Sequence, residues 1–509
     1  MNPSSYEERL GEARGVLSAA LEAAYHDEFL LSNQVLGRSP FSNDYLELFL
    51  SGEEKSASPL LIARSLLLYY AKSSIHYALY LVKKALHAIS GQRAKTFESG
   101  KDAVLVDVVF LVDSIRAAGR FDERYFFPGL SAFLKDNNIR YAYLPFFYSG
   151  SYQRKPFELF KVFRILKAQD EPVLTEFQLL NIIDILRISL FILAYPFHVL
   201  RFRKTLGAAT FGNRILRYEL VRALDHVTFY SYIRYLVGRR IAALPFSSLK
   251  VISWYENQPM NKNLYKGLRS GAGSVAVYGA QLFPHSLDYH YMMPDANERS
   301  YGLSPDVVVV GGSRYIHDDG AVPYRVGPSL RNARLFAQTS PKTKTPDKDI
   351  VVFLHLFRED TTHLLRLLRD PALEEFKFLL KPHPGLPIDG LGSLVPGNCR
   401  ITDEDLYTLL GHACVAIGGG SGSLVESVAL GVPVICVKSK RRFDYNRGFF
   451  DAGEGVIWSE VATAGELQKE LGRIGMMSGS AAIAELAAGY RNRCFVEPTD
   501  EAIRKAFDF

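Results

Sequence analysis

Runs of aliphatic and β-branched residues alternate with helix-like segments in two separate parts of the chain, and this alternation restricts its possible folds strongly. In the first part, AVLVDVVFLVDS starts at Ala103, and a helix-like stretch separates it from a second apolar run at residues 139–148. An uninterrupted apolar run is typical of a strand that is buried on both faces, as in a parallel sheet. Strand–helix–strand order at this spacing therefore predicts βαβ units.

The alternation continues far along the chain and is interrupted once by a polar stretch. Further strand-like segments of the first set are KVISWYEN, GSVAVYGA and PDVVVVGG, and those of the second set are DIVVFLHLF, FKFLLKPHPG, ACVAIGGGSGS and GVPVICV. The polar, proline-containing residues 338–348 lie between the two sets and predict a linker. We therefore expect an α/β protein with two Rossmann-like domains, whose parallel sheets face each other across a cleft.

Two other parts of the chain have helical patterns. Residues 1–95 predict an N-terminal helical region, and residues 155–245 predict a helical insertion in the first α/β domain. The expected division is therefore a helical region at 1–95, a first Rossmann-like domain at 96–335 and a second one at 336–509. With 509 residues, the chain is long enough for at least two such domains.

The insertion contains an apolar run near Ile188–Phe197, followed by Arg201, Arg203 and Lys204. The run is too short to span a membrane, which takes about twenty apolar residues. Apolar bulk beside clustered cations favours a patch on a membrane surface, and a buried helix pair with a solvated basic end is the alternative. The N-terminus lacks the basic-then-apolar order of a signal peptide, so we expect a cytoplasmic protein with peripheral contact to the inner membrane.

Charge and cysteine content exclude several classes of function. The net charge of +6 is a modest excess, whereas a nucleic-acid-binding domain usually concentrates many more basic residues. None of the 4 cysteines forms a CxxC pair, so neither a zinc site nor a redox motif is indicated. His285, Asp288 and His290 also lack the spacing of a strong metal motif. We therefore expect no metal, no cofactor and no nucleic-acid partner.

The first motif that points to chemistry is FLLKPHPG at residues 378–385, where a strand runs into Lys381 and His383. Ligands of open α/β folds collect at the carboxyl ends of strands. The flanking prolines, Pro382 and Pro384, stiffen the turn that carries the imidazole. His383 is therefore a candidate donor to a phosphate oxygen.

A glycine-rich turn about 35 residues later is the second motif. Gly418, Gly419 and Gly420 end a strand, and Ser421 and Ser423 open the helix that follows. Glycines let a backbone turn tightly and approach a ligand closely. A helix N-terminus also offers N–H groups and partial positive charge to an anion. The turn is not a P-loop, because no GK[ST] follows, and it does not match GxGxxG.

The His-Pro element and the Gly/Ser turn together resemble bacterial GT-B transferases that use CMP-activated acidic sugars, the sialyltransferases and Kdo transferases. The resemblance implies that His383, Ser421 and Ser423 hold the nucleotide phosphate, in a site that includes Lys381, Gly419, Gly420 and Gly422. It also implies an acidic residue that binds the ribose. The candidates for the ribose and base are Asp403, Glu404 and Asp405, of which Glu404 is favoured, together with Glu426 and Pro384. Capping of the next helix is the alternative role for the three acidic residues near 404.

Residues 251–286 resemble a family of surface-carbohydrate biosynthesis proteins, through the aromatic–Glu–Asn–Gln element at Tyr255–Gln258. Pro259 and Met260 depart from the usual continuation of that element, as does the loop FPHSLDYHY. The resemblance implies that Asn257, Gln258 and His285 line the acceptor side.

Glu256 is the main catalytic candidate, because glycosyl transfer needs a base for the acceptor hydroxyl or a carboxylate at the anomeric carbon. The alternative is a carboxylate that interacts with a helix dipole. Asp113 and Arg116, which follow the first strand, form a second catalytic and acceptor-side pair. Arg358 in HLFRED is a candidate for binding donor phosphate, or for an ion pair with Glu359 or Asp360.

Together these features predict a metal-independent glycosyltransferase that moves a sugar, with a CMP-linked acidic sugar such as Kdo favoured, to a surface glycan. O-antigen, capsule and lipopolysaccharide are the glycan classes that the resemblance implies, with a lipid-linked acceptor. Two alternatives stay open. The chain could transfer glycerol phosphate, ribitol phosphate or ribose from a CDP-alditol or phosphoribosyl donor, or it could be a non-catalytic partner in polysaccharide assembly.

Overall fold

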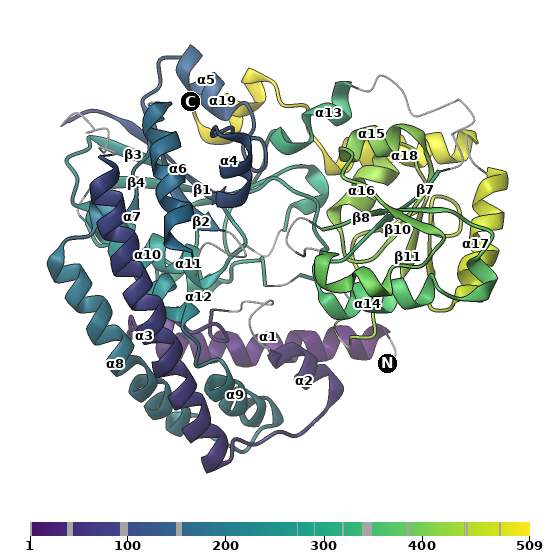
Figure 1. Ribbon diagram of the computed structural model, residues 1–509. Helices are drawn as coiled ribbons and strands as arrows, with labels where there is room; N and C mark the ends of the chain where they lie inside the picture. The colour runs from purple at the N-terminus through teal and green to yellow at the C-terminus, as the bar shows by residue number, and fades with distance from the viewer. Residues whose placement is uncertain are drawn as a thin grey trace. The chain divides into compact units, whose positions relative to one another are not determined.

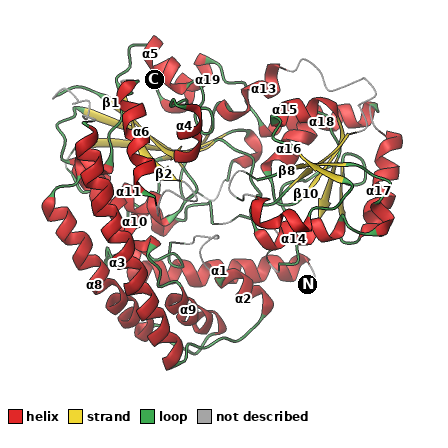
Figure 2. Cartoon of the chain, viewed as in Figure 1, coloured by secondary structure: helices red, strands yellow, loops and turns green. Residues whose placement is uncertain are grey.

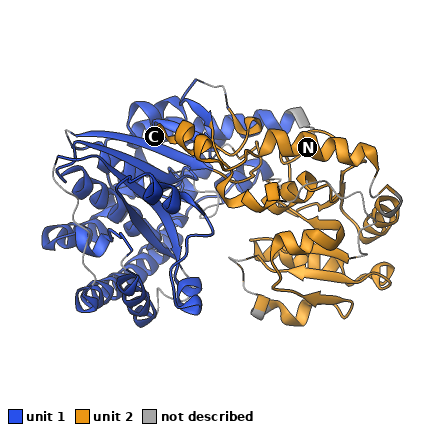
Figure 3. Cartoon of the chain, turned by 90° about the horizontal axis from the view of Figure 1, so that it is seen from above, with its two compact units in different colours: residues 1–281, 290–309, 317–325 blue, residues 282–289, 310–316, 326–509 orange. Residues whose placement is uncertain are grey.

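The chain forms two compact units, shown in separate colours in Figure 3. Unit 1 contains residues 1–281, 290–309 and 317–325, and unit 2 contains residues 282–289, 310–316 and 326–509. The computed structural model describes residues 3–37, 44–91, 100–148, 155–169, 171–271, 273–289, 291–317, 320–337, 349–383, 386, 388–441, 443, 446–477 and 480–509.

Unit 1 is built on a six-stranded sheet of order β2-β1-β3-β4-β5-β6 (Figure 1). Strand β1 pairs in parallel with β2 and β3, and β3 pairs in parallel with β4. Most β1 side chains are buried, as its uninterrupted apolar sequence predicts. The strands are β1 (Ala103–Leu111), β2 (Tyr141–Tyr148), β3 (Ser248–Trp254), β4 (Ser274–Gln281), β5 (Val307–Val310) and β6 (Tyr324–Val326).

Helices make up the rest of unit 1, including the two helical regions that the sequence predicts (Figure 2). The longest is α3, which begins after Ser58, whose side chain caps it, and ends at Gly91 in the left-handed conformation. The helices are α1 (Pro3–Ala24), α2 (Tyr45–Ser51), α3 (Pro59–Ser90), α4 (Val112–Ala118), α5 (Leu130–Asp136), α6 (Pro156–Ala168), α7 (Glu176–Leu179), α8 (Ile182–Thr205), α9 (Phe211–Arg222), α10 (Val227–Ala242), α11 (Pro259–Leu268) and α12 (Ala296–Ser300).

A buried ion pair fastens α10 to the sheet of unit 1. The guanidinium of Arg234 donates to the carboxylate of Asp107 on β1, and both side chains are almost fully buried. The hydroxyl of Ser253 on β3 donates to the other carboxylate oxygen at 2.7 Å. The carboxylate of Asp107 is therefore held by two elements besides its own strand.

Unit 2 contains a second six-stranded sheet, of order β12-β11-β10-β7-β8-β9, and all five neighbouring pairs are parallel. Counted from its first strand, this is the order 3-2-1-4-5-6 of doubly wound folds, and the direction of winding reverses between β7 and β10. The strands are β7 (Asp349–Phe353), β8 (Phe378–Lys381), β9 (Cys399–Ile401), β10 (Ala413–Gly418), β11 (Val434–Val437) and β12 (Trp458–Val461). The main helices are α13 (Ala333–Ala337), α14 (Arg358–Leu367), α15 (Leu406–His412), α16 (Gly422–Ala429), α17 (Ala464–Met477), α18 (Ala481–Cys494) and α19 (Asp500–Phe507).

These sheets confirm the predicted α/β class with two parallel sheets, an N-terminal helical region and a helical insertion. Three short strands, β6, β9 and β12, have no counterpart in the predicted elements, since a polar residue interrupts each of them and leaves no continuous apolar run. The unit boundary also differs from a single division at 335/336, because residues 282–289 and 310–316 group with unit 2.

Candidate functional site

The reversal point of unit 2 carries a small pocket at the carboxyl ends of β7 and β10. Ligands of open α/β sheets bind at such a point. His355 follows β7, whereas Gly418 and Gly419 end β10 and start the glycine turn. The full lining is His355, Asp360, His363, Leu364, Gly418, Gly419, Val437, Lys438, Ser439 and Asn446.

The glycine turn is fixed by Asn446. The side-chain oxygen of Asn446 accepts the N–H of Gly420 at 2.7 Å, and its amide nitrogen donates to the carbonyl of Val437 at 2.9 Å. Gly420 has φ +54°, a conformation that side chains other than glycine rarely adopt. The N–H of Gly420 is thus engaged within the protein, and the turn has its shape before any ligand binds.

Replacing Asn446 by Leu is expected to lower the free energy of unfolding by roughly 1–3 kcal/mol, because the half-buried N–H of Gly420 and the buried carbonyl of Val437 lose their partner. Urea unfolding followed by circular dichroism would measure the change. Asn492→Leu, at an exposed position of α18, is the matched control and should change stability by no more than about 0.5 kcal/mol. Equal stability of the two variants would contradict the fixing role of Asn446.

Ser421 begins α16 and caps it, since its hydroxyl oxygen accepts the N–H of Ser423 at 3.3 Å. At Gly422, a Cβ would lie 2.9 Å from the carbonyl oxygen of Pro284, so a larger residue would displace the 282–289 segment. The structure therefore places the predicted phosphate-binding residues Gly419, Gly420, Ser421, Gly422 and Ser423 together at one helix N-terminus.

His355 belongs to this site, although the sequence analysis did not select it. The N–H of Phe357 donates to its Nδ1 at 2.9 Å, so the neutral ring carries its proton on Nε2. Burial, and secondarily the charge of Arg441, lower the pKa of His355 to about 4. A buried neutral imidazole with a proton on Nε2 is a hydrogen-bond donor at neutral pH. The position of His355 just after a predicted strand is the sequence feature that could have identified it as a site residue.

His383 follows β8, the neighbour of β7, as predicted. Burial, and secondarily the electrostatic effects of His355 and Arg331, lower the pKa of its imidazole to about 4. The three groups are thus close enough to interact. Burial makes protonation of either histidine unfavourable. A bound phosphate would reduce this cost, because its negative charge favours the charged ring. Pro384 lies outside the described residues.

Glu426 on α16 is a buried carboxyl within a polar cluster. Burial raises its pKa, while the charge of Arg331 and hydrogen bonds from Tyr407 and Asn332 offset part of that rise. The side-chain nitrogen of Asn332 also donates to the hydroxyl of Tyr407 at 3.2 Å. The structure thus surrounds the second ribose candidate with three polar side chains.

Glu404 has different surroundings. Its carboxylate lies 3.4 Å from Nε2 of His412, whose Nδ1 lies 2.9 Å from the carboxylate of Asp349, the first residue of β7. Its backbone carbonyl accepts from the ammonium of Lys381 at 2.5 Å. Asp405 caps α15. Helix capping is the alternative role that the sequence suggests for Asp403, Glu404 and Asp405. The carboxylate of Glu404 thus contacts His412, which also contacts the amino end of β7. Glu426, by contrast, lies on α16, the helix that follows the glycine turn.

Arg358 is the first residue of α14 and its side chain is exposed. Within the same turn, Asp360 accepts from the hydroxyl of Ser439 at 2.7 Å and lines the pocket. Arg441 lies over the ring of Phe357, 4.5 Å from its centre. Arg441 is a cation near the pocket that the sequence analysis did not select, because nothing in the 438–446 loop marks it.

Glu256 of unit 1 lies just beyond the carboxyl end of β3, as predicted. The indole N–H of Trp254 donates to its carboxylate at 2.8 Å. The indole packs edge-on against Phe126 with ring centres 4.7 Å apart, so the donor is itself held in place. The carboxylate is partly exposed. A fixed carboxylate of this kind can accept a proton from a hydroxyl group.

Asn257 and Gln258, predicted on the acceptor side, have structural partners. Asn257 is fully buried, with φ +52°, and donates to the carbonyl of Tyr291 at 2.9 Å. Gln258 forms a capping box with Asn261 at the start of α11. Their side chains stabilise the turn that carries Glu256.

His285 groups with unit 2, where its ring lies 4.7 Å from that of Tyr315. It is almost completely buried, and its Nδ1 lies 3.1 Å from the carbonyl oxygen of Phe283. Nearby, Asp288 pairs with Arg447 at 2.8 Å. His290 lies outside the described residues. The structure thus places His285 in the packing of the 282–289 segment.

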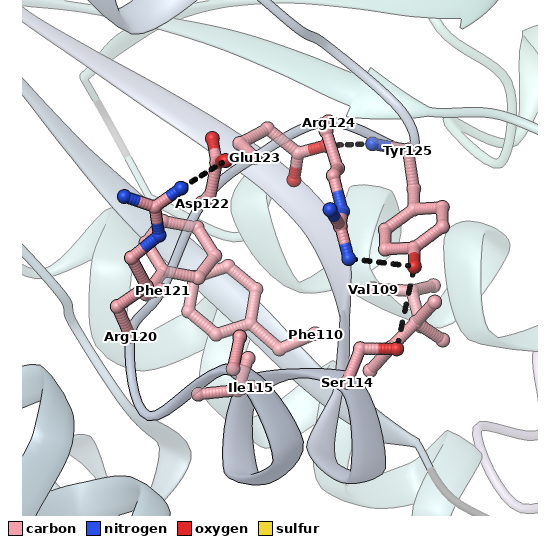
Figure 4. Close-up of a pocket in the computed structure, with 12 residues that line it drawn as sticks. Val109, Phe110, Ser114, Ile115, Arg120, Phe121, Asp122, Glu123, Arg124 and Tyr125 are labelled. Carbon is pink, nitrogen blue, oxygen red and sulfur yellow. Dashed lines mark hydrogen bonds and ion pairs between the residues drawn. The ribbon is translucent and has the colours of Figure 1, made fainter.

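A second hollow, shown in Figure 4, lies beside β1 and α4 of unit 1. Glu123 dominates it, since one carboxylate oxygen accepts the N–H groups of Tyr125, Phe126 and Phe127. Asp113 lies on the first turn of α4, and Arg116 pairs with Glu158 of α6 at 3.1 Å. The hollow is lined by Val109, Phe110, Leu111, Ser114, Ile115, Ala118, Arg120, Phe121, Asp122, Glu123, Arg124 and Tyr125.

Among the residues that the structure describes, no group of three or more His, Cys, Asp or Glu side chains is placed so that it could hold a metal ion. The four cysteines are free thiols, two of them buried.

No protein-family model matches the chain, and no curated protein matches it. Solved structures with similar architecture include the glycotransferase of kitacinnamycin, at 12% identity and TM-score 0.40, with 81% of this chain and 98% of that chain covered. MurG of Acinetobacter baumannii has 11% identity and TM-score 0.42, with 80% and 100% covered. UDP-GlcNAc 2-epimerase of Neisseria meningitidis has 10% identity and TM-score 0.43, with 79% and 99% covered. These values establish neither a family nor an activity.

Proposed function

We propose that the chain is a GT-B transferase that binds the phosphate of a nucleotide-activated donor at the reversal point of unit 2. One observation carries the proposal: His355, which interacts electrostatically with His383, lines the same pocket as Gly418 and Gly419 of the glycine turn before α16. Imidazole N–H groups and helix N-termini both favour an anion. Arg331 and Arg441 add positive charge close to the histidines.

Glu426 is the preferred ribose ligand in this proposal, because it lies on the helix that the glycine turn opens. Tyr407 and Asn332 already orient its carboxyl. Glu404 stays the other candidate, although its carboxylate is engaged with His412. The resemblances favour a CMP-linked acidic sugar as donor and a lipid-linked surface glycan as acceptor. The reaction would need no metal and would take place at the cytoplasmic face of the inner membrane.

The chemistry assigned to unit 1 is deprotonation of the acceptor hydroxyl by Glu256. As the hydroxyl oxygen attacks the anomeric carbon, the bond to the nucleotide phosphate breaks, and the proton moves to the carboxylate. The departing phosphate gains negative charge, which the histidines and the helix N-terminus would stabilise. Binding and base catalysis thus fall to different residues and can be tested separately.

A thermal-shift panel with CMP, CDP, UDP, GDP and phosphoribosyl pyrophosphate tests the donor site. A ligand at a hundred times its Kd should stabilise the folded protein by about 2.7 kcal/mol. His383→Ala should lose most of that stabilisation, because it removes a phosphate contact. His26→Ala is the matched control, since this exposed histidine belongs to unit 1 and is not among the candidate donor-site residues.

A response to CMP that His383→Ala removes would support the CMP-sugar donor. A stronger response to CDP or phosphoribosyl pyrophosphate would replace it by the alditol-phosphate or ribosyl alternative. The absence of any response would contradict the proposed donor site and favour a non-catalytic partner.

A further inference from the structure

Two long helices of unit 1, α3 and α8, leave many large apolar side chains in contact with solvent. On α3, Leu67 is 71% exposed and Ile89 is 73% exposed, and on α8, Phe197 is 68% exposed. Single exposed apolar residues are common on protein surfaces, whereas contiguous patches mark interaction sites. The residues concerned are Leu60, Leu67, Leu68, Ile75, Leu81, Val82 and Ile89 of α3, and Ile182, Ile183, Leu186, Leu190, Leu193 and Phe197 of α8.

The two helices lie against each other in opposite directions (Figure 1). The hydroxyl of Tyr70 donates to the carbonyl of Leu193 at 3.0 Å, and the hydroxyl of Tyr77 donates to the carbonyl of Ile185 at 3.2 Å. As the residue number rises on α3, the number of its partner on α8 therefore falls. This pairing places the apolar residues of both helices on neighbouring strips, which we call the α3–α8 face.

The charge of the two helices points to an anionic partner. Together they contain 8 Lys or Arg residues, of which Lys83 is buried and Lys72 pairs with Asp225, and a single acidic residue, Asp184, which is buried and paired with Arg240. Arg64, Arg201 and Lys204 are exposed. Apolar side chains with cations alongside them favour a membrane surface that carries anionic lipids.

The apolar run near Ile188–Phe197, which by itself is too short to span a membrane, is part of the 24-residue helix α8. This longer helix is long and apolar enough to cross a membrane, the one helix among the described residues that meets this criterion. Its other face, however, is built into unit 1, and 44% of its most apolar window is buried there. The side-chain nitrogen of Asn33 donates to the fully buried hydroxyl of Tyr195 at 2.7 Å, and His198 pairs with Asp27 at 2.5 Å. Spanning would expose these polar contacts to hydrocarbon, so the packing favours a helix that lies along the surface.

We propose that the α3–α8 face binds the surface of an anionic lipid bilayer, with α8 lying parallel to that surface. The inference rests on the proposed function in one respect: an enzyme with a membrane-borne acceptor would need to bind the membrane surface. Binding itself requires neither donor nor acceptor, so it can fail while the donor site stands.

Co-sedimentation of the full chain with vesicles tests this inference. We expect binding to phosphatidylcholine vesicles that contain phosphatidylglycerol, weaker binding to phosphatidylcholine alone, and loss of binding at high salt. The double variants Leu67→Glu with Ile75→Glu, and Leu190→Glu with Leu193→Glu, should each bind at least roughly tenfold more weakly, because they place carboxylates in the interface. Leu190→Met with Leu193→Met should retain binding.

Ile401→Glu is the matched control, since Ile401 is 45% exposed but lies on β9 of unit 2, and it should bind like the unaltered chain. The melting temperature of each variant without ligand reports on its folding, and its nucleotide thermal shift keeps the two proposals separate. Unchanged binding by both double Glu variants, or equal binding to both vesicle types, would overturn the inference. So would sedimentation equilibrium showing a dimer that the double Glu variants abolish and that vesicles do not dissociate, because a second copy would then cover the face.

Discussion

Replacing Glu256 by Gln should lower kcat by about 10²–10⁴-fold, the usual contribution of a general base. The side chain keeps its size, and the indole N–H of Trp254 can still donate to the amide oxygen. Only the capacity to take a proton is lost, so the nucleotide thermal shift should be unchanged. Steady-state sugar transfer, measured with the donor that the thermal-shift panel identifies, gives the rate.

A matched control for Glu256→Gln is Glu171→Gln, since Glu171, like Glu256, is partly exposed, and it pairs with Lys135 at 4.0 Å. Trp254→Phe should cause a smaller loss than Glu256→Gln, because the carboxylate remains but its orienting donor is gone. Normal turnover by Glu256→Gln would contradict the assigned role, and Asp113 would become the leading base.

Replacing Asp107 by Ala should lower the free energy of unfolding by about 3–5 kcal/mol. The guanidinium of Arg234 would stay buried without its carboxylate, and the hydroxyl of Ser253 would lose its acceptor. A loss of this size is a large share of the stability of an ordinary domain, about 5–15 kcal/mol. Urea unfolding measured on the full chain gives the difference.

Two further variants separate the charge effect from general damage. Glu54→Ala removes an exposed ion pair with Arg214 and should cost no more than about 1 kcal/mol. The double variant Asp107→Leu with Arg234→Met should be more stable than Asp107→Ala, because no unpaired charge remains. A double variant as unstable as Asp107→Ala would show that the loss comes from packing rather than from charge.

The fold was predictable where local sequence and packing agree. The apolar run at β1 becomes a strand buried in a parallel sheet, and the long helical pattern that starts at Pro59 becomes α3. Strand β9 is different, because its exposed Arg400 and Ile401 give no buried-strand pattern and only pairing with β8 makes it a strand. The helical pattern of residues 464–490 predicts one helix, whereas the structure has two there, α17 and α18.

The candidate site was predictable in part, since His383 and the glycine turn were chosen from the sequence. His355 and Asn446 were missed, because their roles depend on which strands are neighbours and on how a long loop returns to the glycine turn. Asn257 and Gln258 show the reverse case, in which polar residues beside a catalytic candidate stabilise a turn. The roles of Glu256, His383 and Glu426 in binding and catalysis stay predictions.

The chain passes from one unit to the other five times between residues 281 and 326. Unit 2 is therefore not a contiguous segment, and no single cut yields it whole. A fragment starting at residue 336 would lack Pro284, against which Gly422 packs, as well as the packed rings of His285 and Tyr315. Exchange of unit 2 between related chains, by recombination or in the laboratory, would have to carry residues 282–289 and 310–316 along with it.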